Sequence, residues 1–175
     1  MASARRGAAA KAAILMAAAF FVAGAQGRTA NLEERLLASH NRERAALGIG
    51  PLRWDANLAQ GAREWADHLA ETRRFEHSPD DPAAERIGEN IWGGTPGAFT
   101  PESMVRLWIA EKAHFVPGTF PTNSATGQVA DVSHYTQLVW RRTGEVGCAL
   151  SEKGEEEILV CRYSEAGNVR GSAPF

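Results

Sequence analysis

Four ionisable side chains interrupt segments of the chain that are otherwise apolar: His77, Glu89, Glu111 and His134. A buried carboxylate costs free energy unless it is paired or hydrogen-bonded. Two imidazoles and two carboxylates that converge in one cleft would meet this need and could also bind a divalent metal such as zinc. The alternative is a buried hydrogen-bond network that only holds structural elements together, because isolated His and Glu residues are usually not ligands. The residues alone leave both interpretations open.

The segments that carry these four residues show different local patterns. The run 87–92 has the pattern of a short strand, and it contains Glu89. Thr100-Pro101-Glu102 is typical of a helix start, with a capping side chain, proline in the first turn and an early acid. This helix carries Glu111 one turn after Trp108. Segment 134–142 fits either a short helix or a strand, and it follows a long loop at 114–133, a type of loop that is often functional.

Two further helices are expected before the first histidine of the set. Asn31 can cap a helix with Glu34 at its third position, and Gly48 ends that helix. His40 lies on its apolar face, where a hydrogen-bonded core histidine is expected rather than a ligand. Asp55 can cap a second amphipathic helix. Helices that flank a modest antiparallel sheet indicate an α+β fold.

The composition limits the class of protein. The chain has 175 residues, of which 44% are hydrophobic, with 19 basic and 21 acidic residues. It lacks the basic excess of a nucleic-acid-binding protein, so we expect no nucleic-acid partner. Neither a nucleophile-elbow motif, a zinc-protease helix motif nor a phosphate-binding glycine loop is present in the sequence.

The first 25 residues have the pattern of a secretory signal peptide. Arg5, Arg6 and Lys11 are basic, residues 12–24 are apolar, and residues 23–25 form an A-x-A cleavage signal. An uncleaved anchor is the alternative, although the apolar run is short for a membrane span. We therefore expect a protein secreted to the periplasm or the extracellular space, with residues 26–175 as a single domain and no membrane span after cleavage.

Export changes the interpretation of the two cysteines, Cys148 and Cys161. In an oxidising compartment a single pair predicts a disulfide. Alternating apolar residues on both sides of Gly154-Glu155 predict a β-hairpin with a two-residue type II′ turn. In this register the two cysteines lie opposite each other. A pair of catalytic thiols is the alternative, and the absence of C-x-x-C spacing disfavours it.

Five motifs in order resemble the CAP superfamily of cysteine-rich secretory proteins, antigen 5 and plant pathogenesis-related class 1 proteins. The resemblance extends from about Leu32 to the C-terminus, and the chain looks like a secreted bacterial relative of the plant proteins. The matching segments are Ser39-His40-Asn41-Arg42-Glu43-Arg44, Pro51-Leu52-Arg53-Trp54-Asp55, Gly88-Glu89-Asn90-Ile91, Trp108-Ile109-Ala110-Glu111-Lys112 and His134-Tyr135-Thr136-Gln137-Leu138-Val139-Trp140. Cys161-Arg162-Tyr163 with Gly167-Asn168 resembles the C-terminal signature.

The resemblance implies an α-β-α sandwich with a small antiparallel sheet between helical layers. It also implies that His77, Glu89, Glu111 and His134 line one cleft, which in some members holds zinc or another divalent cation through the two histidines. We expect a non-enzymatic defence or interaction protein, a monomer, with an unknown extracellular ligand. Two alternatives remain: a metal-assisted hydrolase with Glu89 or Glu111 as general base, and a carrier of lipids or sterols, which some members bind.

Overall fold

The computed structural model describes residues 27–79, 83 and 85–175, and the expected signal peptide lies outside them. The chain divides into two compact units, residues 1–31 and 32–175, and each is described by itself. In the first unit, residues 27–29 are helical. No helix in the described part of the chain has both the length and the apolar character to cross a membrane. The domain boundary expected at residue 26 stays a prediction.

The helices of the second unit precede its long β-hairpin in the chain. The described residues of this unit form α2 (Leu32–Ala46), α3 (Ala56–Thr72), α4 (Pro101–Ala110), the 3₁₀ helices η1 (Glu111–His114) and η2 (Val129–Asp131), and α5 (Ser133–Leu138). Asp55 caps α3 by accepting the amide of Leu58, and Thr100 caps α4 by accepting the amide of Ser103. The cap expected at Asn31 is wrong, because its φ of 54° is not the extended conformation of an N-cap residue.

The sheet has four strands in the order β1-β3-β4-β2. These are β1 (Arg53–Trp54), β2 (Gly88–Gly94), β3 (Glu145–Lys153) and β4 (Glu156–Ser164). Strands β2, β4 and β3 are antiparallel, as expected, whereas the short β1 pairs parallel to β3. Strand β2 is therefore an edge strand, and its residue Glu89 lies near the end where the chain enters the sheet.

The β3–β4 hairpin confirms the predicted register. Cys148 lies opposite Cys161 and the two form a disulfide, while Lys153 lies opposite Glu156. Gly154 has φ +65°, and Glu155 has no positive φ, as a type II′ turn requires. The alternation of side chains in the sequence was sufficient to fix this pairing, because a slip of one residue would turn every side chain to the other face.

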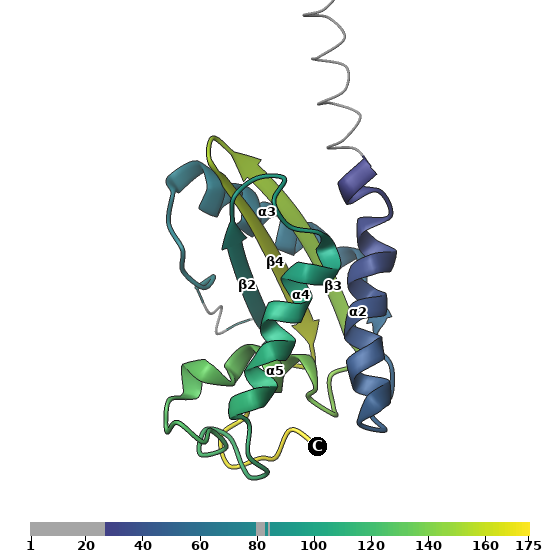
Figure 1. Ribbon diagram of the computed structural model, residues 1–175, viewed down its shortest axis with the longest axis vertical. Coiled ribbons are helices and arrows are strands. Elements are labelled where there is room, and N and C mark those ends of the chain that lie inside the picture. The colour runs from purple at the N-terminus through teal and green to yellow at the C-terminus, as the bar shows by residue number, and fades with distance from the viewer. Residues whose placement is uncertain (1–26, 80–82, 84) are drawn as a thin grey trace, which may run out of the picture. The chain divides into compact units, whose positions relative to one another are not determined.

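Helices cover both faces of the sheet, which gives the expected α-β-α sandwich (Figure 1). On one face, Ile91, Ala149 and Val160 pack with Leu69 of α3. The other face buries a larger core that includes the disulfide and Leu159 of β4, together with side chains of α2 and α4. Within β2, and likewise within β4, consecutive side chains point to opposite faces of the sheet. Two neighbours in sequence therefore enter different layers of the sandwich.

Candidate functional site

His77 and Glu89 form the first of two histidine–carboxylate pairs. The Nδ1 atom of His77 lies 2.9 Å from Oε1 of Glu89. The same Oε1 accepts the backbone amide of Ser78 at 3.0 Å, and Oε2 accepts the Ser78 hydroxyl at 2.9 Å. The His77 side chain is 65% exposed, while that of Glu89 is only 8% exposed. The strand thus supplies a nearly buried acceptor that holds an exposed imidazole.

The pKa values of this pair are shifted in opposite directions. The hydrogen bond to Glu89 raises the pKa of His77 and outweighs the opposing effect of burial. Burial favours a higher pKa for Glu89, but the hydrogen bonds from His77 and Ser78 overcome it, so the pKa of Glu89 is lowered. Both shifts favour a carboxylate at Glu89, which accepts hydrogen bonds and donates none.

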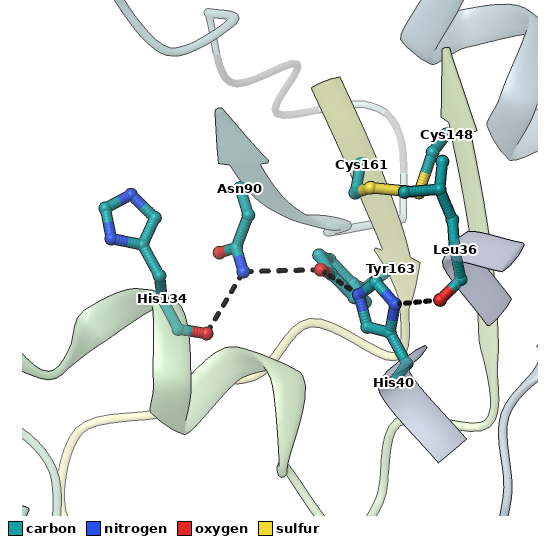
Figure 2. Close-up of a disulfide and its surroundings, with 7 residues drawn as sticks. All are labelled: Leu36, His40, Asn90, His134, Cys148, Cys161 and Tyr163. Carbon is teal, nitrogen blue, oxygen red and sulfur yellow. Dashed lines mark hydrogen bonds between the residues drawn. A yellow bond between two sulfur atoms is a disulfide. The ribbon is translucent and has the colours of Figure 1, made fainter. Parts of the chain in front are cut away.

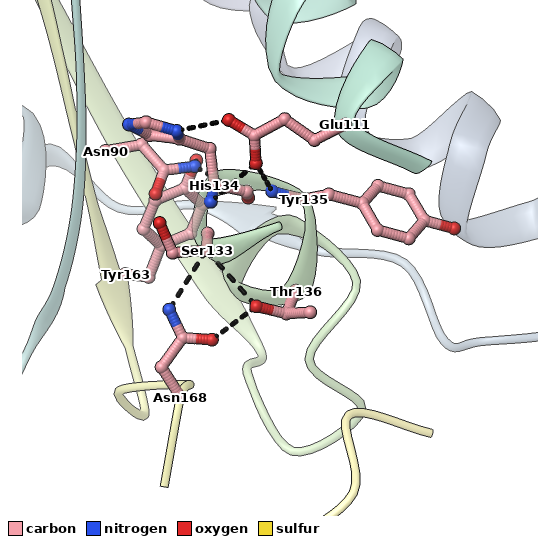
Figure 3. A network of polar contacts seen from close by, with 8 residues as sticks. All are labelled: Asn90, Glu111, Ser133, His134, Tyr135, Thr136, Tyr163 and Asn168. Atoms are coloured by element: carbon pink, nitrogen blue, oxygen red, sulfur yellow. Dashed lines mark hydrogen bonds and ion pairs between the residues drawn. The ribbon is translucent and has the colours of Figure 1, made fainter. Parts of the chain in front are cut away.

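His134 and Glu111 form the second pair, shown in Figure 3. Oε1 of Glu111 lies 2.5 Å from Nδ1 of His134, and Oε2 accepts the amides of His134 and Tyr135, each at 3.0 Å. The imidazole also stacks on the indole of Trp108, with the two ring planes 9° apart. Glu111 therefore fixes both the ring of His134 and the first turn of α5.

Asn168, which follows β4, holds α5 from its other side. Its amide nitrogen donates to the Ser133 carbonyl at 2.9 Å, and its amide oxygen accepts the Thr136 hydroxyl at 2.7 Å (Figure 3). Asn168 has φ 55°, a conformation that asparagine tolerates better than most residues. The segment that carries His134 is thus held between a carboxylate from η1 and an amide from the C-terminal segment.

A buried polar network approaches the same helix from the core. The Asn90 amide donates to the His134 carbonyl at 3.0 Å and to the Tyr163 hydroxyl at 3.3 Å. The Tyr163 hydroxyl lies 2.9 Å from Nε2 of His40, whose Nδ1 is 2.8 Å from the Leu36 carbonyl (Figure 2). His40 is therefore the hydrogen-bonded core histidine that the sequence predicts, and it is fully buried.

The two pairs approach the sheet from different layers. Glu89 and Asn90 are consecutive in β2, so their side chains leave opposite faces of the sheet. A pocket of about 900 Å³ is lined by His77 and Glu89, and neither Glu111 nor His134 belongs to its lining. Within the described ranges, no group of three or more His, Cys, Asp or Glu side chains is placed to hold a metal ion.

Each imidazole nevertheless has the orientation of a metal ligand. A carboxylate occupies Nδ1 in both pairs, and because a carboxylate only accepts, Nδ1 carries the hydrogen. In the neutral imidazole Nε2 then bears the lone pair, and in the described part of the chain it has no hydrogen-bond partner in either histidine. Metal-binding histidines commonly have this carboxylate–imidazole arrangement. The donor set therefore fits a cation that prefers nitrogen ligands, with the two acids as orienting groups rather than ligands.

Two residues that support these pairs, Trp108 and Arg162, lie in segments that resemble the family, but the sequence did not predict their contacts with the pairs. Trp108 is buried, and its stacking on His134 depends on how α4 and α5 pack. Arg162 lies directly opposite Glu89 in the sheet, with its Nε 3.4 Å from Oε2 of Glu89. The available signal for Arg162 was a charge within the apolar strand Ile158–Tyr163.

Comparison with known sequences finds matches over most of the chain. The model of the CAP, or cysteine-rich secretory protein, family matches residues 37–163. A pathogenesis-related protein of PR-1 type from Sambucus nigra is 34% identical over 146 residues, which are 83% of each chain. Pathogenesis-related protein 1A from Nicotiana tabacum is 34% identical over 157 residues, 89% of this chain and 88% of the relative.

Solved structures share the fold at lower identity. A crystal structure of NaASP2 with Zn²⁺ has a TM-score of 0.69 and 21% identity, and the match covers 85% of this chain and 87% of NaASP2. The structure of BmVAL-1 has a TM-score of 0.64 and 23% identity, over 84% of this chain and 82% of that one. At these identities the structures support the α-β-α arrangement.

Proposed function

Because the chain belongs to the CAP, or cysteine-rich secretory protein, family, we propose that it is a secreted defence or interaction protein that binds a divalent cation, zinc first, through His77 and His134. The family membership supports a defence or interaction role in general. The cation is a finer proposal about this chain. It is supported by two imidazoles that each present Nε2 while a carboxylate holds Nδ1.

The chemistry of the donor set favours zinc among common cations. Imidazole nitrogen is a preferred ligand of zinc, whereas calcium and magnesium prefer oxygen ligands. Two histidine ligands leave coordination positions for water or for a partner molecule, because zinc in proteins is usually four-coordinate. The crystal structure of NaASP2 with Zn²⁺, which has the same fold, gives independent support for this choice of metal.

Calorimetric titration of zinc into chelator-treated protein tests the proposal. We expect one site in the wild type and a loss of affinity of at least about tenfold in His77→Ala and in His134→Ala, since each removes a ligand. His68→Ala is the matched control, because His68 is an exposed histidine of α3 that stacks on Trp65 and has no hydrogen bond to Glu89 or Glu111 among the described residues. Its affinity should equal that of the wild type.

The single variants also test whether the two imidazoles share one ion. If they share it, either substitution abolishes the same binding event. Two independent weak events, each lost in one variant only, would contradict the shared site. Unchanged binding in the double variant would overturn the metal proposal altogether.

A further inference from the structure

Arg162 places a charged group beneath the His77–Glu89 pair. It lies on β4 directly opposite Glu89, and its side chain is 18% exposed. An arginine side chain on the inner layer of a sheet usually has bidentate or multiple acceptors, because burial of its charge is costly without them. The acceptors around Arg162 therefore show whether the protein itself satisfies the donors of the guanidinium.

Those acceptors are few. Nε of Arg162 is enclosed and makes no hydrogen bond, and its nearest carboxylate oxygen is Oε2 of Glu89 at 3.4 Å. The oxygens of Glu89 already accept three shorter hydrogen bonds from His77 and Ser78. Among the described residues no other acceptor reaches the guanidinium. The enclosed Nε is costly to leave without a hydrogen bond. The two Nη atoms are not enclosed and have no hydrogen bond to a described residue, so they remain available to a ligand in the pocket.

The sequence of α3 leaves room for this guanidinium. Gly61 lies in the interior of α3, where glycine is disfavoured relative to alanine. A Cβ atom at position 61 would lie 2.6 Å from Nη1 of Arg162. Glycine at this position therefore allows the side chain of Arg162 to pass between the helix and the sheet.

The same arginine lines the pocket of about 900 Å³, within the size range of small-molecule sites. Trp65 and Ile87 contribute apolar surface to the pocket, and Gln137 and Asn168 contribute amides. We propose that this pocket binds a small organic acid, whose carboxylate pairs with Arg162 and whose apolar part packs against Trp65 and Ile87. The fork of a guanidinium matches the two oxygens of a carboxylate.

A carboxylate suits the pocket better than a phosphate. Glu85 and Glu89 also line the pocket, and they oppose a doubly charged ligand more strongly than a singly charged one. Arg86, at the same pocket, is exposed and can hydrate its charge. Selectivity for a monoanion therefore follows from one enclosed arginine beside two acids.

Benzoate is a suitable probe, with benzyl alcohol as the neutral analogue and phenyl phosphate as the dianion. In chelator-treated full-length protein, NMR titration should show benzoate binding that perturbs the Trp65 indole signal. Arg162→Gln should weaken benzoate by about tenfold or more, the effect of one charge-assisted hydrogen bond, and leave benzyl alcohol unchanged. Arg86→Gln is the matched control and should change benzoate affinity less than about threefold, because a solvent-exposed charge contributes little.

Gly61→Ala provides a second test that does not remove the charge. The new methyl group displaces the guanidinium of Arg162, so the binding of benzoate should weaken. Helix α3 should be at least as stable as in the wild type, because alanine is a better helix former than glycine. Thermal unfolding checks that the variant folds. Equal benzoate affinity in wild type, Arg162→Gln and Gly61→Ala would overturn the proposal, and so would tighter binding of phenyl phosphate than of benzoate.

The experiment separates this proposal from the metal site. The chelator removes zinc, so benzoate binding is measured without a contribution from the metal. Loss of zinc binding in the histidine variants together with unchanged benzoate affinity in Arg162→Gln would overturn the organic-acid site only. Benzoate binding that needs Arg162, with no zinc bound by the wild type, would overturn the metal proposal only.

Discussion

Glu89 and Asn90 are neighbours on β2, yet their side chains enter very different surroundings. Glu89 faces a pocket of about 900 Å³ together with the exposed His77 and the incompletely bonded Arg162. Asn90 enters a closed network in which the Tyr163 hydroxyl connects it to a fully buried histidine (Figure 2).

The two sides of β2 differ in what their side chains do. On the Asn90 side the amide nitrogen of Asn90 donates to the His134 carbonyl and to the Tyr163 hydroxyl, so the network holds the backbone of His134 in place. On the Glu89 side, space and unused donors remain for a ligand. The layer that holds Asn90 therefore fixes the backbone position of His134, and the layer that holds Glu89 has room for a small ligand beside Arg162.

The largest expected effect is a loss of folding stability at low pH, caused by the buried His40 in the network with Tyr163 and Asn90. Burial lowers the pKa of His40 to about 4, despite the hydrogen bond to the Leu36 carbonyl, so the folded protein holds it neutral. Between pH 6.5 and pH 4 the unfolded chain binds the proton more readily, and stability falls as the pH falls. At pH 4 this group alone should cost about 3 kcal/mol relative to pH 7.

Urea unfolding at pH 7 and pH 4 measures this effect. His40→Asn should lose less stability between the two pH values than the wild type does, by about the same 3 kcal/mol. His68→Asn, an exposed position, is the control and should behave as the wild type. If His40→Asn remains as acid-sensitive as the wild type, the closed network is not the source of the acid effect.

The second prediction uses the two acids, which differ in what surrounds each oxygen. In Glu111→Gln, the remaining oxygen can keep both backbone amides only if the new NH₂ faces Nδ1 of His134. The imidazole must then move its hydrogen to Nε2. In Glu89→Gln, the NH₂ can donate to the Ser78 hydroxyl, so His77 keeps its tautomer.

Nitrogen-15 chemical shifts of the two imidazoles report these tautomers. We expect the Nδ1–H form at both positions in the wild type and in Glu89→Gln, and a change at His134 alone in Glu111→Gln. Zinc affinity should fall by about tenfold or more in Glu111→Gln and less in Glu89→Gln, because Nε2 must carry a lone pair to bind metal. Equal effects of the two substitutions would remove the distinction between the pairs.

The smallest effect is on stability at neutral pH. His134 stacks on Trp108 and is 30% exposed, whereas His77 is 65% exposed. We expect His134→Ala to destabilise the protein by about 1 kcal/mol and His77→Ala by less than about 0.5 kcal/mol. Chemical unfolding at pH 7 checks both values. A larger loss of unfolding free energy in His77→Ala would show that the His77–Glu89 pair also stabilises the fold.

The sequence predicted the features that depend on local periodicity. The hairpin register, the disulfide and the caps at Asp55 and Thr100 follow from alternation and from short-range hydrogen bonds. The ambiguous segment 134–142 contains a helix, and its type was decided by packing rather than by its own pattern.

The partner of each site residue was not predictable in this way. The choice of Glu89 for His77 and of Glu111 for His134 depends on loops and helix packing that no short spacing encodes. The contact between Arg162 and Glu89 was not predictable for a related reason. The apolar residues Cys161 and Tyr163 lie on one face of β4, and Arg162 points to the other.

The adjacency of Glu89 and Asn90 also limits how the gene can change in length. Gain or loss of one codon between Gly88 and Gly94 would put the residues on its two sides out of phase, so that either Glu89 and Asn90 or the later residues of β2 would face the wrong layer. The connections before and after that stretch can absorb such changes. Anyone who transplants the site into another scaffold must accordingly move the dipeptide as an indivisible unit, together with the neighbouring strand that sets its phase.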